Sequence, residues 1–294
     1  MEELIWARIG LAIAVMVAGS ISDWRTRTAS DRFWYVLGIG GALLLGLEMF
    51  MDDASWISLA CLVLITLVFM DLLWDRPGIF EDGINPLPLA LYALTIVAYA
   101  YMTVTEYDEG YFWTMIEVPV LIALFFILYQ FDVIKGGADA KAMMALSFCF
   151  AIYPAIDGLP LLQLTYTESQ EMLTFPVLLL FNGALLTLVM PLGMFFLNLV
   201  RRDIRFPLMF LGVRMSIDEA PSKHVWPMER VVDGELKTSV FKQDDDDEAN
   251  WGALRARGVD RPWVTPKVPF LIPLTFAVPF SFVVGNVIFY LMGI

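Results

Sequence analysis

The chain has 294 residues, of which 59% are hydrophobic and 17% are charged, and its formal net charge is −13. Its mean hydropathy is +0.68, and its apolar content exceeds the roughly 45–50% of ordinary soluble domains, so a soluble protein is excluded. The acidic balance and the lack of a basic footprint argue against a nucleic-acid partner. The two cysteines, Cys61 and Cys149, lie inside apolar runs and provide neither a disulfide framework nor a metal site.

Eight apolar runs approach the length of about 20 residues that a helix needs to cross a bilayer. The N-terminus lacks the basic region of a cleavable signal peptide, so the first run is counted as a retained helix. Gly38, Ala42 and Gly46 recur every four residues in the second run, which favours close helix packing. The predicted fold class is all-α membrane, a polytopic bundle of about eight transmembrane helices near residues 4–22, 33–50, 56–74, 85–104, 113–133, 140–156, 174–199 and 268–292.

The basic residues fall almost entirely on one side of this predicted bundle. In a chain that crosses eight times, the loops after the first, third, fifth and seventh helices share a side, and they hold 18 of the 19 lysines and arginines; Arg8 is the exception. Cytoplasmic loops of membrane proteins are enriched in these residues. We therefore predict a multi-pass protein of the plasma membrane with both termini outside.

One long polar segment, residues 201–266, precedes the last predicted helix and is expected to be cytoplasmic. Its Asp233-Gly234 pair predicts a β-hairpin turn, so we expect a small α+β or β-hairpin unit. The chain would then comprise a transmembrane bundle at 1–200, this segment, and a last transmembrane helix at 267–294.

The same segment holds two features that do not require a functional role. The acidic run from Asp244 to Glu248 is typical of a solvated loop. His224 is the only histidine of the chain. With no second histidine and no cysteine nearby, we expect it to be structural or at the surface, and we expect no metal site.

Two aspartates are predicted at the same depth on different helices, where they are able to meet. Asp23 closes the first helix, and Asp139 follows Gly136-Gly137-Ala138 and opens the sixth. Ionisable residues at membrane depth are costly and point to function, and glycines permit an irregular backbone where another segment approaches closely. Structural explanations stay open: a salt bridge from Asp23 to Arg25 or Arg27, and capping of the sixth helix by Asp139.

At these residues the sequence resembles a known family. Gly136-Gly137-Ala138-Asp139 is similar to the GxGD motif of membrane aspartyl proteases, in the form found in archaeal prepilin and preflagellin peptidases. Asp23-Trp24-Arg25-Thr26-Arg27 resembles the family's first-aspartate motif, and Trp263–Phe270 is similar to the stretch before the last helix of the archaeal members. In two respects the chain departs from them: Ala138 replaces the second glycine, and the aspartates are far enough apart for four helices, where simpler members place two.

The resemblance implies an aspartic endopeptidase that removes the leader of a type IV prepilin-like or preflagellin precursor at the cytoplasmic face, without a cofactor. It implies that Asp23 and Asp139 are catalytic and that Gly136, Gly137 and Ala138 form the active-site loop. Bacterial relatives that also N-methylate carry a cysteine-rich loop, which is absent here, so no methyltransferase activity is expected. The basic residue of the leader is expected to meet acids at the same face, although ordinary loop charge also explains each of them: Asp71, Asp75, Glu81, Asp82 and Asp132.

Two carboxylates suit this hydrolysis, because an ionised one takes a proton from water while a protonated one polarises the scissile carbonyl. Close carboxylates cannot both ionise, so the pair shares a proton, as in aspartic proteases. A helix N-terminus favours the anion and a C-terminus disfavours it. This predicts Asp139 as the base and Asp23 as the acid, although Arg25 and Arg27 act in the opposite sense.

Two other functions are considered for the same residues. A proton- or cation-coupled transporter would use Asp23 and Asp139 as ion sites, but such sites are expected near the midplane between inverted repeats, and no repeat is evident. A presenilin-like intramembrane protease would require a Pro-Ala-Leu motif near its last catalytic helix, which this sequence lacks.

Overall fold

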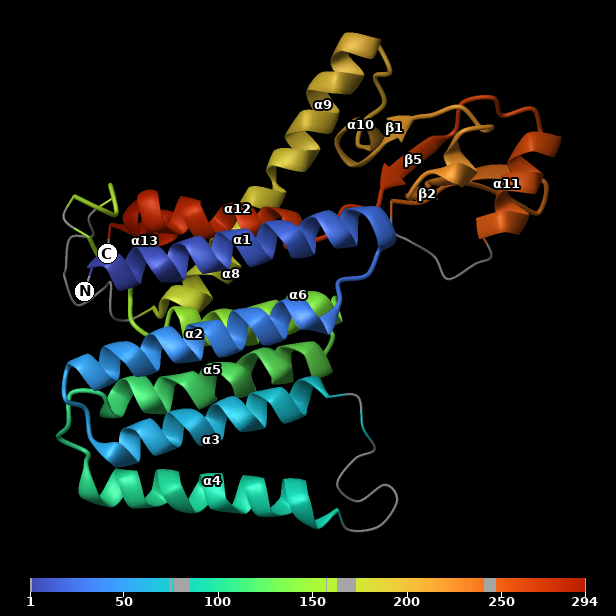
Figure 1. Ribbon diagram of the computed structural model, residues 1–294. Helices are drawn as coiled ribbons and strands as arrows, with labels where there is room; N and C mark the ends of the chain where they lie inside the picture. Colours follow the sequence, from blue (N-terminus) through green and yellow to red (C-terminus); the bar gives the residue numbers. More distant parts are fainter. Residues whose placement is uncertain are drawn as a thin grey trace. The chain divides into compact units, whose positions relative to one another are not determined.

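The computed structural model describes residues 2–74, 76, 85–156, 158–162, 173–240 and 247–293. Their contacts define two compact units (Figure 1). Unit 1 comprises Met1–Ala184 and Pro269–Ile294 and is a helical bundle, whereas unit 2 comprises Leu185–Val268 and contains the β-strands. The predicted fold class, an all-α membrane bundle with a small β-containing segment before the last helices, is confirmed.

Unit 1 is built from long apolar helices. Within the described residues, six stretches are long and apolar enough to cross a membrane. Five are the helices α1 to α5. The sixth is Phe175–Arg201, which consists of α8, the turn residue Leu188 and α9, the last of which belongs to unit 2. The chain is therefore a multi-pass membrane protein. The helices of the bundle are α1 (Glu2–Thr26), α2 (Asp31–Met51), α3 (Trp56–Leu73), α4 (Pro86–Thr105), α5 (Phe112–Gln130), α6 (Gly137–Cys149), α8 (Phe175–Thr187), α12 (Leu271–Val283) and α13 (Val287–Met292).

Two of the eight predicted transmembrane helices are shorter than expected. α6 has 13 residues and ends at Cys149, before the predicted end at 156. It packs against α1, α2 and α5, so most of its surface contacts protein. The apolar residues of α6 therefore face other helices and not lipid. The last predicted helix is interrupted at Gly285, whose φ of +95° ends α12 and precedes α13.

Small residues let α2 lie close to two other helices, α3 and α6. A Cβ placed on Gly41 would lie 2.7 Å from Cys149 Sγ and 2.8 Å from Cys149 N of α6, and one on Gly38 would overlap the Phe69 ring of α3. A Cβ on Gly46 would lie 3.3 Å from Leu62, also of α3. The close packing predicted from the spacing of the small residues in α2 is therefore confirmed.

Arg8, the basic residue that departs from the predicted charge distribution, is neutralised inside the bundle. Its guanidinium forms an ion pair with Glu48 of α2, and both side chains are almost fully buried. Arg8 also donates to the Leu44 carbonyl oxygen at 3.4 Å. A buried charge without a partner is costly, so this pair explains how an arginine is accommodated between α1 and α2.

Unit 2 contains a three-stranded antiparallel sheet in the order β1-β5-β2. The central strand β5 includes Trp263, which is buried, and the backbone N–H of Trp263 donates to the buried Glu229 carboxylate at 3.1 Å. The Trp263–Phe270 motif thus begins as the central strand of this unit. Its elements are α9 (Val189–Arg201), α10 (Leu208–Leu211), β1 (Val213–Arg214), a 3₁₀ turn (Ala220–Ser222), β2 (Val225–Pro227), β3 (Glu229–Val232), β4 (Glu235–Thr238), α11 (Asp247–Ala256) and β5 (Trp263–Pro266).

The predicted hairpin is confirmed as β3 and β4, in which Val232 pairs with Glu235. Asp233 and Gly234 have φ angles of 54° and 74°, the left-handed conformation that a two-residue hairpin turn requires. His224 is exposed, as expected. Of the predicted acidic loop, residues 244–246 lie outside the described part of the chain, and the remainder begins α11.

We predict that Gly41→Ala lowers the free energy of unfolding by roughly 1–3 kcal/mol, because the added methyl group meets backbone as well as the thiol of Cys149 and overpacks the α2–α6 contact. The matched control is Gly10→Ala in α1, where a Cβ would meet nothing within 4 Å. Unfolding both variants by titration with a denaturing detergent measures the difference. Equal stability of the two variants would contradict the packing described for α2.

Candidate active site

Asp23 lies in the last turn of α1. In the preceding turn, α1 contacts one neighbouring helix on each side. On one side, a Cβ on Gly19 would lie 3.1 Å from the buried indole of Trp34 in α2, so α1 and α2 approach closely here. On the other, the Ser20 hydroxyl lies 2.7 Å from the Thr275 hydroxyl of α12. Asp23 is thus carried on a helix end that is held by two neighbours.

Asp139 lies in the first turn of α6 and is 9% exposed. Its side chain folds back over the start of the helix, and a Cβ on Gly136 would overlap the Asp139 Oδ2 atom. A Cβ on Gly137 would lie 3.4 Å from the Tyr129 hydroxyl of α5, an ordinary contact. Of the two glycines, Gly136 is therefore the one that the Asp139 carboxylate requires.

The glycines were expected to permit an irregular backbone, and the structure gives a different reason for them. Gly136 is the N-cap residue of α6 with φ of −91° and ψ of 117°, which is ordinary extended backbone, and Gly137 is already helical. Neither conformation requires glycine. Gly136 is needed because a side chain would occupy the place of the Asp139 carboxylate. Ala138, the residue that departs from the family motif, is a helical residue of the same turn.

The structure brings the two predicted aspartates together. The last turn of α1 and the first turns of α2 and α6 form one end of unit 1, the Asp23 end (Figure 1). α1 and α6 contact each other directly, and the carboxyl group of Asp139 interacts electrostatically with that of Asp23. Two acids more than a hundred residues apart in sequence thus share one environment.

Neither structural explanation for these acids fits the geometry. Among the described residues, no hydrogen bond or ion pair of either carboxylate is found, and α6 has no side-chain cap. Arg27 interacts electrostatically with Asp23 without forming a salt bridge, and its guanidinium lies 5.9 Å from the centre of the Trp24 ring. Two partly or fully buried carboxylates without a structural partner are costly, and this points to a functional use.

An ion pair that sequence reasoning missed lies beside Asp139. Lys141 lies two residues after Asp139. Its ammonium group donates a hydrogen bond to Asp31 at the start of α2, with Nζ and Oδ1 2.7 Å apart. The two residues are 110 positions apart in sequence, so no local pattern could have paired them. The pair ties the beginning of α6 to the first turn of α2, and the ion-pair partner of Lys141 is thus Asp31 and not Asp139.

The acids predicted to receive a basic residue differ in their surroundings. Asp71 already accepts hydrogen bonds from Arg76 Nε at 2.8 Å and from the Tyr92 hydroxyl at 3.1 Å. Asp132, in the turn between α5 and α6, is exposed. The remaining three of these acids, Asp75, Glu81 and Asp82, lie outside the described residues.

The described residues contain no group of three or more histidine, cysteine, aspartate or glutamate side chains that could hold a metal ion. Cys61 and Cys149, which lie in apolar runs of the sequence, are both buried and form no disulfide.

Comparison with known proteins identifies relatives over much of the chain. Residues 204–287 match the family described as Archaeal Peptidase A24 C-terminus Type II. A preflagellin peptidase of Methanococcus voltae is 26% identical over 193 residues, covering 62% of this chain and 78% of the relative. The preflagellin peptidases of Methanococcus maripaludis and Methanocaldococcus jannaschii are 24% and 23% identical, over 67% and 63% of this chain and 83% and 77% of theirs. The resemblance predicted from the aspartate motifs is confirmed.

We predict that cysteines placed at the two aspartates can be crosslinked in membranes. In a background with Cys61→Ala and Cys149→Ala, the pair Asp23→Cys and Asp139→Cys should react with an oxidant or a short bifunctional thiol reagent, because α1 and α6 meet at this end. The control pair combines Asp139→Cys with Asp53→Cys, beyond the other end of the 21-residue α2, about 30 Å away by helical rise. Equal crosslinking of the two pairs, or none of either, would contradict the site.

Proposed function

We propose that this relative of the archaeal preflagellin peptidases is a membrane-embedded aspartyl endopeptidase that cleaves the N-terminal leader of type IV prepilin-like or preflagellin precursors. The proposal is supported by the positions of Asp23 and Asp139, which lie at one end of the bundle, near enough to interact electrostatically and without other partners among the described residues. We assign the two acids as the catalytic pair and Gly136, Gly137 and Ala138 as the loop that presents Asp139. No cofactor is required for this chemistry.

The Asp23 end is proposed to face the cytoplasm, so that the leader is cut there. Arg25, Arg27 and Arg32 all lie at this end, in the last turn of α1, the following turn and the first turn of α2, and cytoplasmic ends of transmembrane helices are enriched in basic residues. The first turn of α1 and the end of α13 lie together at the opposite end (Figure 1). Both termini are then outside, and residues 201–266 are cytoplasmic.

The proposed reaction uses one shared proton. Asp139 takes a proton from a water molecule whose oxygen attacks the scissile carbonyl carbon, while protonated Asp23 donates a hydrogen bond to the carbonyl oxygen and then the proton. The tetrahedral intermediate collapses as the C–N bond breaks and the leaving nitrogen takes the proton held by Asp139. The pair returns to its singly protonated state when Asp23 regains a proton from the new carboxyl product.

The assignment of the base and the acid rests on helix polarity. Asp139 lies in the first turn of α6, where the partial positive charge of the helix end favours an anion, and Asp23 lies in the last turn of α1, where the partial negative charge disfavours one. The Arg27 charge near Asp23 acts in the opposite sense. A charged Asp23 would oppose an anion at Asp139, but this repulsion vanishes when Asp23 holds the shared proton. The dipole of α6 then favours the anion at Asp139, to which we assign it.

The basic residue of the leader is proposed to meet the acids of the same end. Asp132 is exposed in the turn that leads to Gly136, and it is the acid whose surroundings suit this role best. Asp71 would have to exchange its contact with Arg76 for the substrate. The other three predicted acids, Asp75, Glu81 and Asp82, belong to the same proposal on sequence grounds alone.

The transporter hypothesis is not supported. A transported ion would need its site near the midplane of the bundle, whereas Asp23 and Asp139 lie at one end of α1 and α6. The similar proteins are peptidases.

We predict that Asp23→Asn and Asp139→Asn each slow the cleavage of a preflagellin-type precursor by about 10²–10⁴-fold, because each removes one side of the proton transfer. The matched control is Asp53→Asn, an exposed acid beyond the opposite end of α2, which should leave the rate unchanged. Cleavage of purified precursor by reconstituted enzyme measures this, with the cut site mapped by mass spectrometry. Cleavage at the control rate by either of the first two variants would overturn the assignment.

The proposed orientation predicts opposite labelling of two engineered cysteines in intact cells. A membrane-impermeant maleimide should react with Thr105→Cys, at the end of α4, and should reach Ser239→Cys, which follows β4, only after permeabilisation. The native cysteines are buried and should contribute little signal. The reverse pattern would place unit 2 outside and remove the proposed cytoplasmic site.

A further inference from the structure

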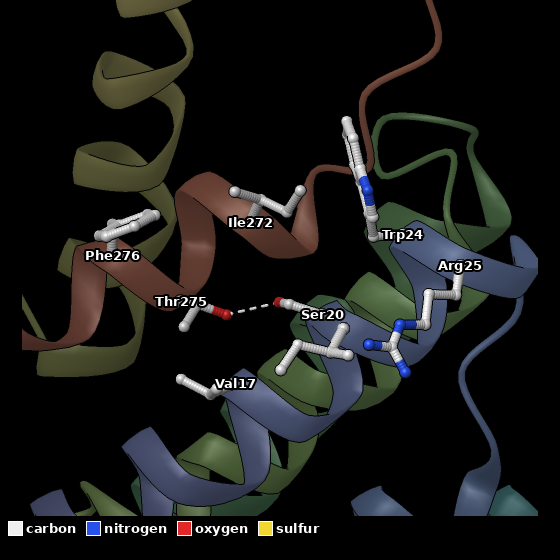
Figure 2. Close-up of a pocket in the computed structure, with 8 residues that line it drawn as sticks. Val17, Ser20, Trp24, Arg25, Ile272, Thr275 and Phe276 are labelled. Carbon is white, nitrogen blue, oxygen red and sulfur yellow. Dashed lines mark hydrogen bonds between the residues drawn. The ribbon is translucent and has the colours of Figure 1, made fainter. Parts of the chain in front are cut away.

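A groove of about 380 Å³ runs between α1 and α12, next to the candidate active site but without Asp23 or Asp139 in its lining (Figure 2). Val17, Ile21 and Phe276 line it and remain 41%, 48% and 64% exposed. Helices that cross a membrane expose such surfaces to lipid. The complete lining is Val17, Ser20, Ile21, Trp24, Arg25, Ile272, Thr275 and Phe276.

The polar atoms of the groove floor are already satisfied by the protein. The Ser20 and Thr275 hydroxyls lie 2.7 Å apart, and both are within hydrogen-bonding distance of the Leu271 carbonyl oxygen, at 3.0 and 2.7 Å. Figure 2 shows this contact closing the groove between the two helices. A ligand would therefore meet apolar surface along the groove and would gain no hydrogen bond from its floor.

The end of the groove is charged. Arg25 is exposed, and among the described residues its guanidinium forms no ion pair or hydrogen bond. In Figure 2 its side chain turns back along α1 beside the groove, with Trp24 above it. A guanidinium binds phosphate with two parallel hydrogen bonds, and tryptophan is enriched at the level of lipid headgroups.

A second groove of this bundle provides an internal comparison. It lies between α2 and α3, has a volume of about 460 Å³, and is lined by residues such as Ile39, Leu43 and Thr66, with no charged side chain. Both grooves offer apolar surface to an acyl chain. The α1–α12 groove combines this apolar surface with an unpaired cation.

We propose that the α1–α12 groove is a binding site for an anionic phospholipid, with one acyl chain along Val17 and Phe276 and the phosphate on Arg25. A leader with a basic residue would be repelled by Arg25, so charge complementarity favours lipid over the precursor. Since Arg25 is two residues from Asp23, the bound lipid also anchors the helix end that carries the candidate acid.

The test measures lipid binding and does not use proteolysis, so it is independent of the proposed function. The full chain is reconstituted in phosphatidylcholine nanodiscs with a trace of phosphatidylglycerol that carries a photoreactive acyl chain, and adducts are mapped by mass spectrometry. We expect adducts on peptides that contain residues 17–25 and 272–276. Unlabelled phosphatidylglycerol should compete there about fivefold better than phosphatidylcholine, the preference expected from one arginine near the headgroups.

Matched variants separate the charge from the groove. Arg25→Gln should abolish the preference, whereas Arg32→Gln, which removes an exposed arginine at the start of α2, should retain it. Val17→Trp should fill the groove and reduce labelling by either lipid, whereas Val36→Trp, at an exposed position of α2, should not. Adducts in the α2–α3 groove should show no headgroup preference.

Three results would overturn the proposal. One is equal competition by the two lipids in the unmodified protein, and another is equal loss of preference in both arginine variants. The third is crosslinking of a photoreactive precursor peptide in the groove with no lipid adduct there, which would assign the groove to the substrate.

Discussion

Close approach between α2 and its neighbours is the constraint on which the rest of unit 1 depends. Helices in lipid gain little from burying apolar surface, so their association relies on van der Waals packing, and small residues permit it. Gly41 places α2 against the end of α6, and Trp34 of α2 fills the space left by Gly19 of α1. Because α1 and α6 both pack on α2, their ends lie close together and Asp23 is near enough to Asp139 to interact with it electrostatically.

That convergence carries an electrostatic cost which the structure does not relieve. Lys141 is engaged by Asp31, and Arg27 interacts with Asp23 without a salt bridge. By contrast, Glu48 is fully neutralised by Arg8 elsewhere in the same bundle. Among the described residues of the bundle, the buried Arg8 and Glu48 are paired, whereas Asp23 and Asp139 have no ion-pair partner, as the proposed hydrolysis requires. Arg25, which lines the α1–α12 groove two residues from Asp23, forms no ion pair or hydrogen bond among the described residues.

Composition and charge predicted the membrane fold. Asp23 follows the first predicted helix and Asp139 follows the fifth, and because odd-numbered helices end on the same side, the sequence also predicted that both acids lie at one end. The Asp233-Gly234 turn was also predictable, because a two-residue hairpin needs two positive φ angles. Hydropathy did not predict the short α6, because a helix that faces lipid and a helix buried among other helices have similarly apolar sequences. The pairs Arg8–Glu48 and Lys141–Asp31, and the groove that Ser20 forms with Thr275, join residues 40, 110 and 255 positions apart. The role of Gly136 depended on where the Asp139 side chain turns. None of these is visible in a local pattern.

The central claim is that Asp23 and Asp139 act as one unit, and a double-mutant comparison of cleavage rates tests it most directly. Residual rates are measured for Asp23→Asn, Asp139→Asn and the variant that carries both substitutions. Residues that act together in one step show grossly non-additive effects. We therefore expect the double variant to be about as slow as the slower single variant. Losses that multiply would show that the two carboxylates act independently and would contradict the shared-proton site.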